Sequence, residues 1–229
     1  MKKNENNTRP VANAEAKNNN TELVFIIDRS GSMAGFESDT VGGFNSMIEK
    51  QRRGEGEVFV STVLFDDSSE VLHDRVPIKD IKPMTLDDYT LGGCTALLDA
   101  IGGAIHHIGN VHKYARREDV PTHTVFVITT DGMENASCQY SSARVKTMIK
   151  RQSEKYGWEF IFVAANIDAL ETAEHIGIRR ERAANYRQSK RGYEMCYEAM
   201  SSFVSRARCS EPMAECDAEW KKNLEEETE

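Results

Sequence analysis

The fold is decided by residues 23–32, which read LVFIIDRSGS. The first five are apolar without interruption, which is typical of a strand buried on both faces of a parallel sheet. Three residues with oxygen-bearing side chains then alternate along the chain: Asp28, Ser30 and Ser32. Alternate residues of an extended segment point the same way, and Gly31 lets the backbone bend without a Cβ clash. The stretch therefore predicts a buried strand that ends in a cluster of polar side chains.

Strand-like and helix-like segments alternate along the rest of the chain. Residues 124–128 and 160–164 are further uninterrupted apolar runs, so they predict two more buried strands. Helices are expected at about residues 41–48, 95–116, 142–156 and 168–177, a weak strand near 183–186, and a last helix with Tyr193, Cys196, Tyr197, Met200, Phe203 and Val204 on one face. This alternation predicts a doubly wound α/β domain, with helices on both faces of a mostly parallel, six-stranded sheet.

One edge of the sheet is expected to be antiparallel. Residues 58–65 predict a strand, residues 66–69 a turn, and residues 70–78 the returning strand of a hairpin. The returning strand carries charges and Pro77, which suit an edge strand because one side of it needs no pairing.

The length and the two ends predict one domain with tails. A chain of 229 residues fits one α/β domain and little more. Residues 1–20 are polar and rich in Asn, without apolar periodicity, and predict a disordered leader. The domain is expected at residues 21–209. Residues 210–229 end in EEETE and predict a solvated acidic tail, with a short helix around Trp220.

Charge and composition argue against several classes of protein. The net charge is −8 and the pI about 5.4, whereas binding nucleic acid or an anionic membrane needs clustered Lys and Arg. Five cysteines without CxxC spacing indicate neither a disulfide framework nor a zinc site. No stretch approaches the ~18 apolar residues of a membrane span, and the N-terminus lacks the apolar core of a secretory signal. A cytoplasmic protein is therefore expected.

Two further loops supply residues to the predicted polar cluster. The segment GGCT, residues 92–95, precedes the long helix, so Thr95 is also expected to be its N-cap. The strand at 124–128 runs into TTDG, residues 129–132, which supplies Asp131. Ligands of open α/β sheets bind outside the carboxyl ends of the strands, so two aspartates, two serines and a threonine are expected at one edge. These hard oxygen donors suit Mg²⁺, or Mn²⁺ or Ca²⁺, rather than zinc.

The order of these motifs resembles that of the von Willebrand factor A (VWA) domain family. DxSxS follows a buried strand, a threonine opens the long helix, and TDG follows the next central strand; the resemblance covers about residues 22–208. It implies a stand-alone, intracellular VWA domain with a metal-ion-dependent adhesion site (MIDAS). In the family, the serines bind the cation directly, and the threonine and aspartates bind it directly or through water. The matching residues of this chain are Asp28, Ser30, Ser32, Thr95 and Asp131.

The predicted ligand set also suggests a function. Two carboxylates and three hydroxyls leave a divalent cation under-neutralised, with a position open to an acidic group from another molecule. The family resemblance implies an adaptor or scaffold module, so we expect one that captures a protein partner through an Asp or Glu carboxylate. Phe36 and Tyr140 are the expected anchors, and Glu134 and Asn135 either shape the rim or only keep their loop soluble. The rim of the site is expected at residues 33–36, 87–93 and 133–140.

Two other interpretations stay open: a Mg²⁺-dependent hydrolase or phosphotransferase, and a scaffold without bound metal. An enzyme needs a nucleophile or a general base within reach of its substrate. His106 is expected roughly 16 Å along the helix from Thr95, and His123 precedes its strand and so falls at the opposite edge of the sheet. Cys94 is the one nucleophile predicted close to the site, without a histidine to activate it. The pattern favours a binding module that is not an enzyme.

Overall fold

The computed structural model describes residues 19–209 and 219–228. The predicted leader, residues 1–20, falls almost wholly outside that part, so it stays a prediction. Within the described part, no helix combines the length and the apolar character that crossing a membrane requires.

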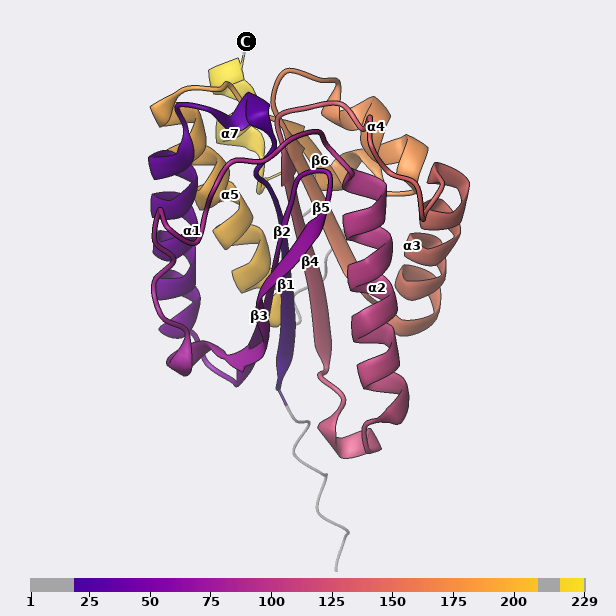
Figure 1. Cartoon of the computed structure of the whole chain (residues 1–229). Helices are drawn as coiled ribbons and strands as arrows, with labels where there is room; N and C mark the ends of the chain where they lie inside the picture. The colour runs from indigo at the N-terminus through magenta and orange to yellow at the C-terminus, as the bar shows by residue number, and fades with distance from the viewer. Residues whose placement is uncertain (1–18, 210–218, 229) are drawn as a thin grey trace, which may run out of the picture.

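A single mixed sheet forms the centre of the molecule, in the order β3-β2-β1-β4-β5-β6 (Figure 1). Neighbouring strands are parallel except β2 and β3, which form the edge hairpin. This confirms the predicted six-stranded sheet with one antiparallel edge strand. The strands are β1 (Thr21–Asp28), β2 (Val58–Phe65), β3 (Ser69–Pro77), β4 (His123–Thr130), β5 (Glu159–Ala164) and β6 (Ala183–Asn185). Strand order reverses between β1 and β4, so the binding edge is expected at their carboxyl ends.

Helices cover both faces of this sheet, as predicted (Figure 1). α1 and α5 pack on one face and against each other, whereas α2, α3 and α4 contribute to the apolar core on the other. The helices are α1 (Glu37–Arg52), α2 (Leu97–Tyr114), α3 (Ser142–Tyr156), α4 (Ala169–Ile176), α5 (Lys190–Arg208) and α7 (Lys222–Thr228).

β1 contributes to both apolar cores. Leu23, Phe25 and Ile27 join the core that includes α1 and α5, while Val24 and Ile26 join the core that includes α2 and α3. All five side chains are at most 1% exposed. Burying a side chain of this size contributes on the order of 1.5–3 kcal/mol, so this uninterrupted apolar run holds the two layers to the sheet.

The start of α2 corrects one prediction. Thr95 is not the N-cap: α2 begins at Leu97, and Ala96 occupies the cap position without a side-chain hydrogen bond. The free N–H groups of the first turn are instead satisfied by the loop after β4. Leu98 N donates to Glu134 Oε2 at 2.9 Å, and Asp99 N donates to Ser137 Oγ at 3.0 Å. The hydroxyl of Thr95 is therefore not used for capping.

The expectation of a solvated C-terminal tail does not hold where the structure describes it. Trp220 is 4% exposed and Leu224 is 1% exposed. The Trp220 indole N–H donates to the carbonyl oxygen of Glu181 at 2.9 Å, and its ring lies edge-on to Phe203 with centroids 5.6 Å apart. These apolar side chains are buried against α5 although the segment is acidic. Residues 210–218 and 229 lie outside the described residues, so the predicted tail there and the predicted domain boundary at residue 209 stay predictions.

Candidate metal centre

The carboxyl ends of β1 and β4 lie side by side and bring two aspartates to one edge of the sheet. Ile27 pairs with Thr129 in the parallel register, so Asp28 is level with Thr130 and one residue short of Asp131. The Thr130 hydroxyl donates to Asp28 Oδ2, which joins the two strand ends directly. The edge predicted from the apolar runs is the edge at which these residues lie.

The hydroxyl groups lie within hydrogen-bonding distance of one another and of Asp131. The Oγ atoms of Ser30 and Ser32 are 3.1 Å apart, and Ser32 Oγ donates to Asp131 Oδ1 at 2.6 Å. A Cβ atom added to Gly132 would lie 3.2 Å from Thr95 Oγ1 and 3.3 Å from Ser32 Oγ. Thr95 and Ser32 therefore share one small space beside Gly132, which a side chain at that position would crowd.

Hydrogen bonds to its side chain and to its backbone hold Asp28 next to this group of hydroxyls. Its Oδ1 accepts a hydrogen bond from the backbone N–H of Ser30 at 2.7 Å. Its backbone carbonyl accepts one from the hydroxyl of Tyr89, a buried residue that no sequence motif indicated. The structure thus brings all five predicted residues to one place, and their action as metal ligands stays a prediction.

The two carboxylates are buried without a cation from the part of the chain that the structure describes. Asp28 is 0% exposed and Asp131 is 2% exposed, and neither forms an ion pair with a Lys or Arg of the described residues. Burial raises the pKa of both carboxyl groups, against hydrogen bonds that lower it, and the charge of Asp131 further raises the pKa of Asp28. The donor set is made only of oxygen atoms and carries uncompensated negative charge, so it fits a hard divalent cation.

The loop that carries the serines is held by an arginine and two glycines. Arg29 Nε lies 3.1 Å from Asp66 Oδ2, so the turn predicted between β2 and β3 also anchors this loop. Gly31 N donates to the Gly93 carbonyl at 3.1 Å, and Gly92 N donates to the Arg29 carbonyl at 2.8 Å. A Cβ at Gly92 would come within 1.8 Å of Asp66 Oδ2, so only glycine fits this close approach.

The loop after β4 is fixed by its own acidic and amide side chains. Glu134 accepts hydrogen bonds from the N–H groups of Ala136 and Ser137 as well as from α2, and Asn135 Oδ1 accepts from Thr95 N at 2.9 Å. Asp99 on α2 accepts in return from the backbone of residues 138–140. Glu134 and Asn135 thus hold the loop and Thr95 in place. Met133, between Gly132 and this anchor, is 71% exposed.

The two predicted aromatic anchors are only partly exposed. Phe36 stacks on Tyr193, with ring centroids 5.1 Å apart. Tyr140 packs on Gly102 of α2, and the Arg144 guanidinium lies 4.5 Å above its ring. Part of each ring therefore already stabilises the fold, and the role of both in partner binding stays a prediction.

Gln188, in the loop before α5, is a site residue that sequence reasoning missed. Its Nε2 donates to Asp131 Oδ2 at 2.8 Å and to the Ser32 carbonyl at 3.3 Å, and its Oε1 accepts from Asn166 at 2.7 Å. Asn166 adopts a left-handed φ of 57°. Gln188 lies 57 residues beyond Asp131 in the sequence, outside any strand-end motif, so no local signal pointed to it.

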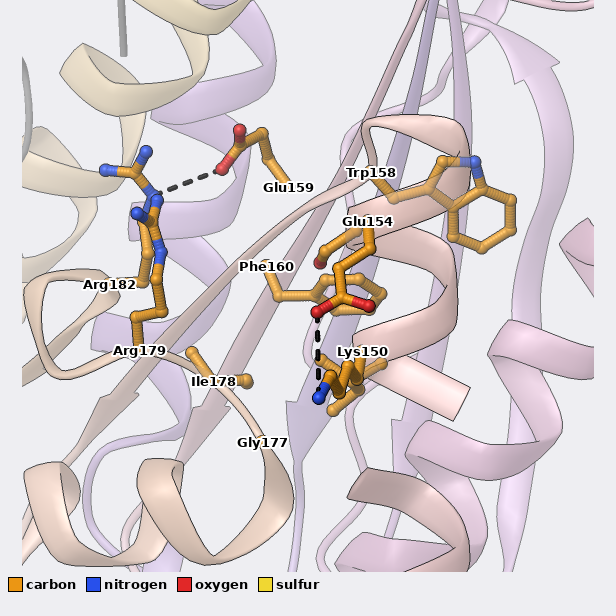
Figure 2. A pocket seen from close by; sticks show the side chains of 11 residues that line it. Lys150, Glu154, Trp158, Glu159, Phe160, Gly177, Ile178, Arg179 and Arg182 are labelled. Carbon is orange, nitrogen blue, oxygen red and sulfur yellow. Dashed lines mark hydrogen bonds and ion pairs between the residues drawn. The ribbon is translucent and has the colours of Figure 1, made fainter. Parts of the chain in front are cut away.

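A cavity elsewhere in the molecule is separate from this centre. Figure 2 shows it between α3 and the segment that leads to β6. Its volume is about 310 Å³. Two ion pairs flank it: Arg182 with Glu159 at 3.1 Å, and Lys150 with Glu154 at 3.7 Å. None of the five predicted metal ligands lines it. His123 begins β4, at the opposite edge of the sheet from the centre, as predicted.

Known families and structures provide a second line of evidence. The model of a family described as VWA domain containing CoxE-like protein matches residues 1–158, more than half of the chain. No curated protein matches the chain.

Among solved structures, proximal thread matrix protein 1 of the mussel byssus is 18% identical, with a TM-score of 0.57, over 81% of this chain and 46% of that chain. The same mussel protein with a zinc occupied MIDAS motif is 15% identical, with a TM-score of 0.58, over 81% and 46%. The vWF domain of the type V pili tip protein Mfa5 from Porphyromonas gingivalis is 9% identical, with a TM-score of 0.56, over 80% and 94%. This chain thus spans less than half of the mussel protein, and these similarities show a shared fold.

Proposed function

The chain belongs to the family of VWA domain containing CoxE-like proteins, and from this premise we propose that it binds a protein partner through a divalent cation held at the carboxyl edge of its sheet. VWA domains are mostly interaction modules rather than enzymes. Its membership in the family supports a metal-dependent interaction in general. The ligand residues, the metal and the partner chemistry are our proposals.

One observation carries the proposal: Asp28 and Asp131 are buried at the same sheet edge, and neither forms an ion pair with a Lys or Arg among the residues that the structure describes. A buried carboxylate without compensation is costly unless a positive charge reaches it. The Ser32 hydroxyl already contacts Asp131, and the Ser30 and Thr95 hydroxyls lie beside it. A small cation that takes oxygen ligands would satisfy all five groups at once.

Each group has a distinct part in the proposed binding. Asp28 and Asp131 supply the negative charge that holds the cation, and the three hydroxyls supply neutral oxygen ligands. A cation held by these five residues would supply Lewis acidity toward an oxygen atom from another molecule. Three of the five proposed ligands are uncharged hydroxyls, so we favour an Asp or Glu carboxylate of the partner as the source of that oxygen atom.

Mg²⁺ is the metal that we propose, with Mn²⁺ and Ca²⁺ as cations that accept the same donors. One structurally similar protein, from the mussel byssus, is described with zinc in its MIDAS motif. Calorimetric titration of the purified chain with Mg²⁺, Mn²⁺, Ca²⁺ and Zn²⁺ ranks the four. Asp131→Ala is expected to lose binding of the preferred cation. If zinc alone binds, the assignment of a hard cation is wrong.

Partner binding is tested by affinity capture from a lysate in Mg²⁺ and in EDTA. The paired variant Ser30→Ala/Ser32→Ala is expected to lose the same proteins as EDTA removes. Its matched control is Ser153→Ala/Ser202→Ala, because both serines are exposed on helices away from the centre. Captured proteins that change with neither the metal nor the two serines would contradict the mechanism and leave a scaffold that needs no metal.

Met133 offers the cleanest test of the rim. Its side chain is 71% exposed next to Gly132, whereas Phe36 also supports Tyr193, so replacing Phe36 would disturb the fold as well. We expect Met133→Ser to weaken capture of the partner by roughly tenfold, as for an apolar interface anchor, without altering metal affinity. Equal partner binding by the variant would place the contact elsewhere on the rim.

The enzyme alternative requires a separate measurement. Incubation of the Mg²⁺-loaded chain with phosphate esters and nucleoside triphosphates is expected to give no turnover. Turnover that disappears in Asp131→Ala would favour the hydrolase or phosphotransferase instead. The cytoplasmic location stays a prediction that fractionation of cells can test.

A further inference from the structure

A short basic segment borders the proposed metal centre on the side of α5. Residues 187–191 read RQSKR and connect β6 to the first turn of α5. The middle of this segment touches the centre, because Gln188 Nε2 lies 2.8 Å from Asp131 Oδ2 and 3.3 Å from the Ser32 carbonyl. Arg187 and Lys190 therefore lie within two residues of a side chain that contacts two of the predicted ligand residues.

The backbone of this segment is closely fixed rather than loosely attached. Ser189 N donates to the Arg187 carbonyl at 2.8 Å, and the Ser189 hydroxyl accepts from Gly192 N at 3.1 Å as the N-cap of α5. A Cβ at Gly192 would come within 1.9 Å of the Arg187 carbonyl, so a glycine is required there. This packing fixes the backbone of the basic residues next to Gln188, whose side chain contacts the centre.

Arg187 and Lys190 are exposed cations for which the structure shows no ion pair among the described residues. The first turn of α5 has no acidic residue, although the positive end of a helix dipole favours acidic residues over basic ones. The helix dipole disfavours basic residues at this end of α5, and the chain as a whole carries a net charge of −8. Two exposed cations at this position therefore suggest a role in binding another molecule.

The opposite side of the centre carries the opposite charge. Asp67 is exposed, and its carboxylate lies 3.0 Å from where a Cβ of Gly93 would be. Gly93 in turn accepts a hydrogen bond from Gly31, in the loop between the two site serines. The rim thus carries an exposed acid beside Gly93, at the β2–β3 turn, and exposed basic residues beside Gln188, at the start of α5.

From this polarity we infer that the partner segment carries more than one acidic residue: one carboxylate for the cation, and at least one more on the side facing Arg187 and Lys190. The inference rests on the proposed function and names the chemistry of its partner, an acidic protein segment that binds in one direction. A cation near an exposed carboxylate adds modest affinity for each pair, and the pairs together give selectivity among acidic segments.

Two labelled peptides of equal length test this by fluorescence anisotropy in Mg²⁺. One has a single glutamate in a Gly/Ser background, and the other has the same glutamate with three more on one side. We expect the second to bind roughly tenfold more tightly at low salt, with the advantage shrinking as salt screens it. Arg187→Ala/Lys190→Ala is expected to reduce that advantage to about twofold or less, with the Mg²⁺ affinity unchanged.

The matched control is Arg53→Ala/Lys79→Ala, which removes two exposed cations at the other end of the molecule and is expected to keep the full preference. Circular dichroism and the Tm of each variant establish that it is folded. If both peptides bind equally in Mg²⁺, or the control pair reduces the preference as much as Arg187→Ala/Lys190→Ala, the inference is wrong while the metal-dependent function stands.

Two further outcomes separate the inference from the proposed function. If neither peptide needs Mg²⁺ and Asp131→Ala binds as the wild type does, the proposed function fails with these probes. The acidic peptide could instead bind independently of Mg²⁺, through Arg187 and Lys190, and be displaced by inorganic phosphate as well as by unlabelled peptide. In that case the segment is a general anion site and the inference is overturned.

Discussion

The two ends of β1 carry buried acids that the fold treats in opposite ways. Glu22, near the amino end, and Asp28, at the carboxyl end, are both 0% exposed. Glu22 Oε2 lies 2.8 Å from Arg75 Nε and 3.4 Å from His112 Nε2. Asp28 instead accepts hydrogen bonds from the Ser30 N–H and the Thr130 hydroxyl, and forms no ion pair with a Lys or Arg among the described residues. Within the described residues, Glu22 thus has a basic partner and Asp28 has none, which is what we expect if Asp28 binds a cation from outside.

The residue that pairs with Glu22, Arg75, has a strained backbone conformation. Arg75 adopts a φ of 51°, in the left-handed region, at an irregularity in the pairing of β2 with β3. A left-handed conformation of a residue other than glycine costs on the order of 1–3 kcal/mol. In the described residues, no comparable distortion brings a cation to Asp28. A buried acid that the chain supplies with a partner is structural, and one that it does not supply is a candidate for binding.

The largest expected effect comes from removing the basic partner of Glu22, at the amino end of β1. Arg75→Ala leaves Glu22 buried beside His112 alone, so we expect the free energy of unfolding to fall by about 3 kcal/mol. The loss should be the same in Mg²⁺ and in EDTA, because Glu22 is at the other end of β1. Urea unfolding at neutral pH measures it. A loss under about 0.5 kcal/mol would mean that the ion pair does not support the fold.

The second prediction addresses the binding end. If Mg²⁺ binds the folded state alone, Mg²⁺ at a hundredfold excess over its Kd should add about 2.7 kcal/mol to the free energy of unfolding. The same addition is expected in Arg75→Ala, and none in Asp131→Ala. Urea unfolding with and without Mg²⁺ measures all three proteins. A wild type unaffected by millimolar Mg²⁺ or Mn²⁺ would make this edge a vestige of a metal site.

The third prediction compares the two acids directly in the absence of metal. Asp28→Asn removes a buried charge that the chain does not balance, so it is expected to stabilise the metal-free protein by about 1 kcal/mol. Glu22→Gln removes a balanced charge and strands Arg75, so it is expected to destabilise the protein. Urea unfolding in EDTA measures whether each substitution raises or lowers the free energy of unfolding. Equal destabilisation by both substitutions would show that the two ends of β1 do not differ.

The smallest expected effect concerns a third acid, Asp99, which lies in the first turn of α2 rather than on β1. Partial burial raises the pKa of Asp99, but hydrogen bonds from the backbone of Cys138, Tyr140 and Gln139 outweigh this, and the net pKa lies below the ordinary 3.8. Asp99→Asn is expected to cost at most about 1 kcal/mol near neutral pH, because water screens this half-buried group.

The pH dependence of that cost has a defined direction. A carboxyl whose folded pKa is lowered contributes stability above its unfolded pKa, near 3.8, and loses it as the pH falls through the lower folded pKa. The difference between wild type and Asp99→Asn should therefore be full near neutral pH and shrink below about pH 4. Urea unfolding across this range checks it, and a difference that grows in acid would contradict the assignment.

Most of the fold was predictable, because the features that specify it are local. The apolar runs in β1, β4 and β5 specified strands buried on both faces, and Pro77 with its charged neighbours specified an edge strand. The two errors arose where local rules compete with distant contacts. Thr95 has a good N-cap side chain, yet Glu134 and Ser137 cap α2 from another loop. Trp220 lies in an acidic segment, yet α5 offers it an apolar surface.

The sequence by itself determined the strands, the edge hairpin and the set of five oxygen-bearing residues, since the alternation of a strand and the position of strand ends depend only on nearby residues. Only the tertiary structure decided which neighbours these residues meet. It placed Gln188 against Asp131, Arg29 against Asp66 and the basic start of α5 beside the centre. Within the part of the chain that it describes, it also gives Glu22 a basic partner and Asp28 none. Charge balance in a buried site depends on groups far apart in sequence, so no local pattern encodes it.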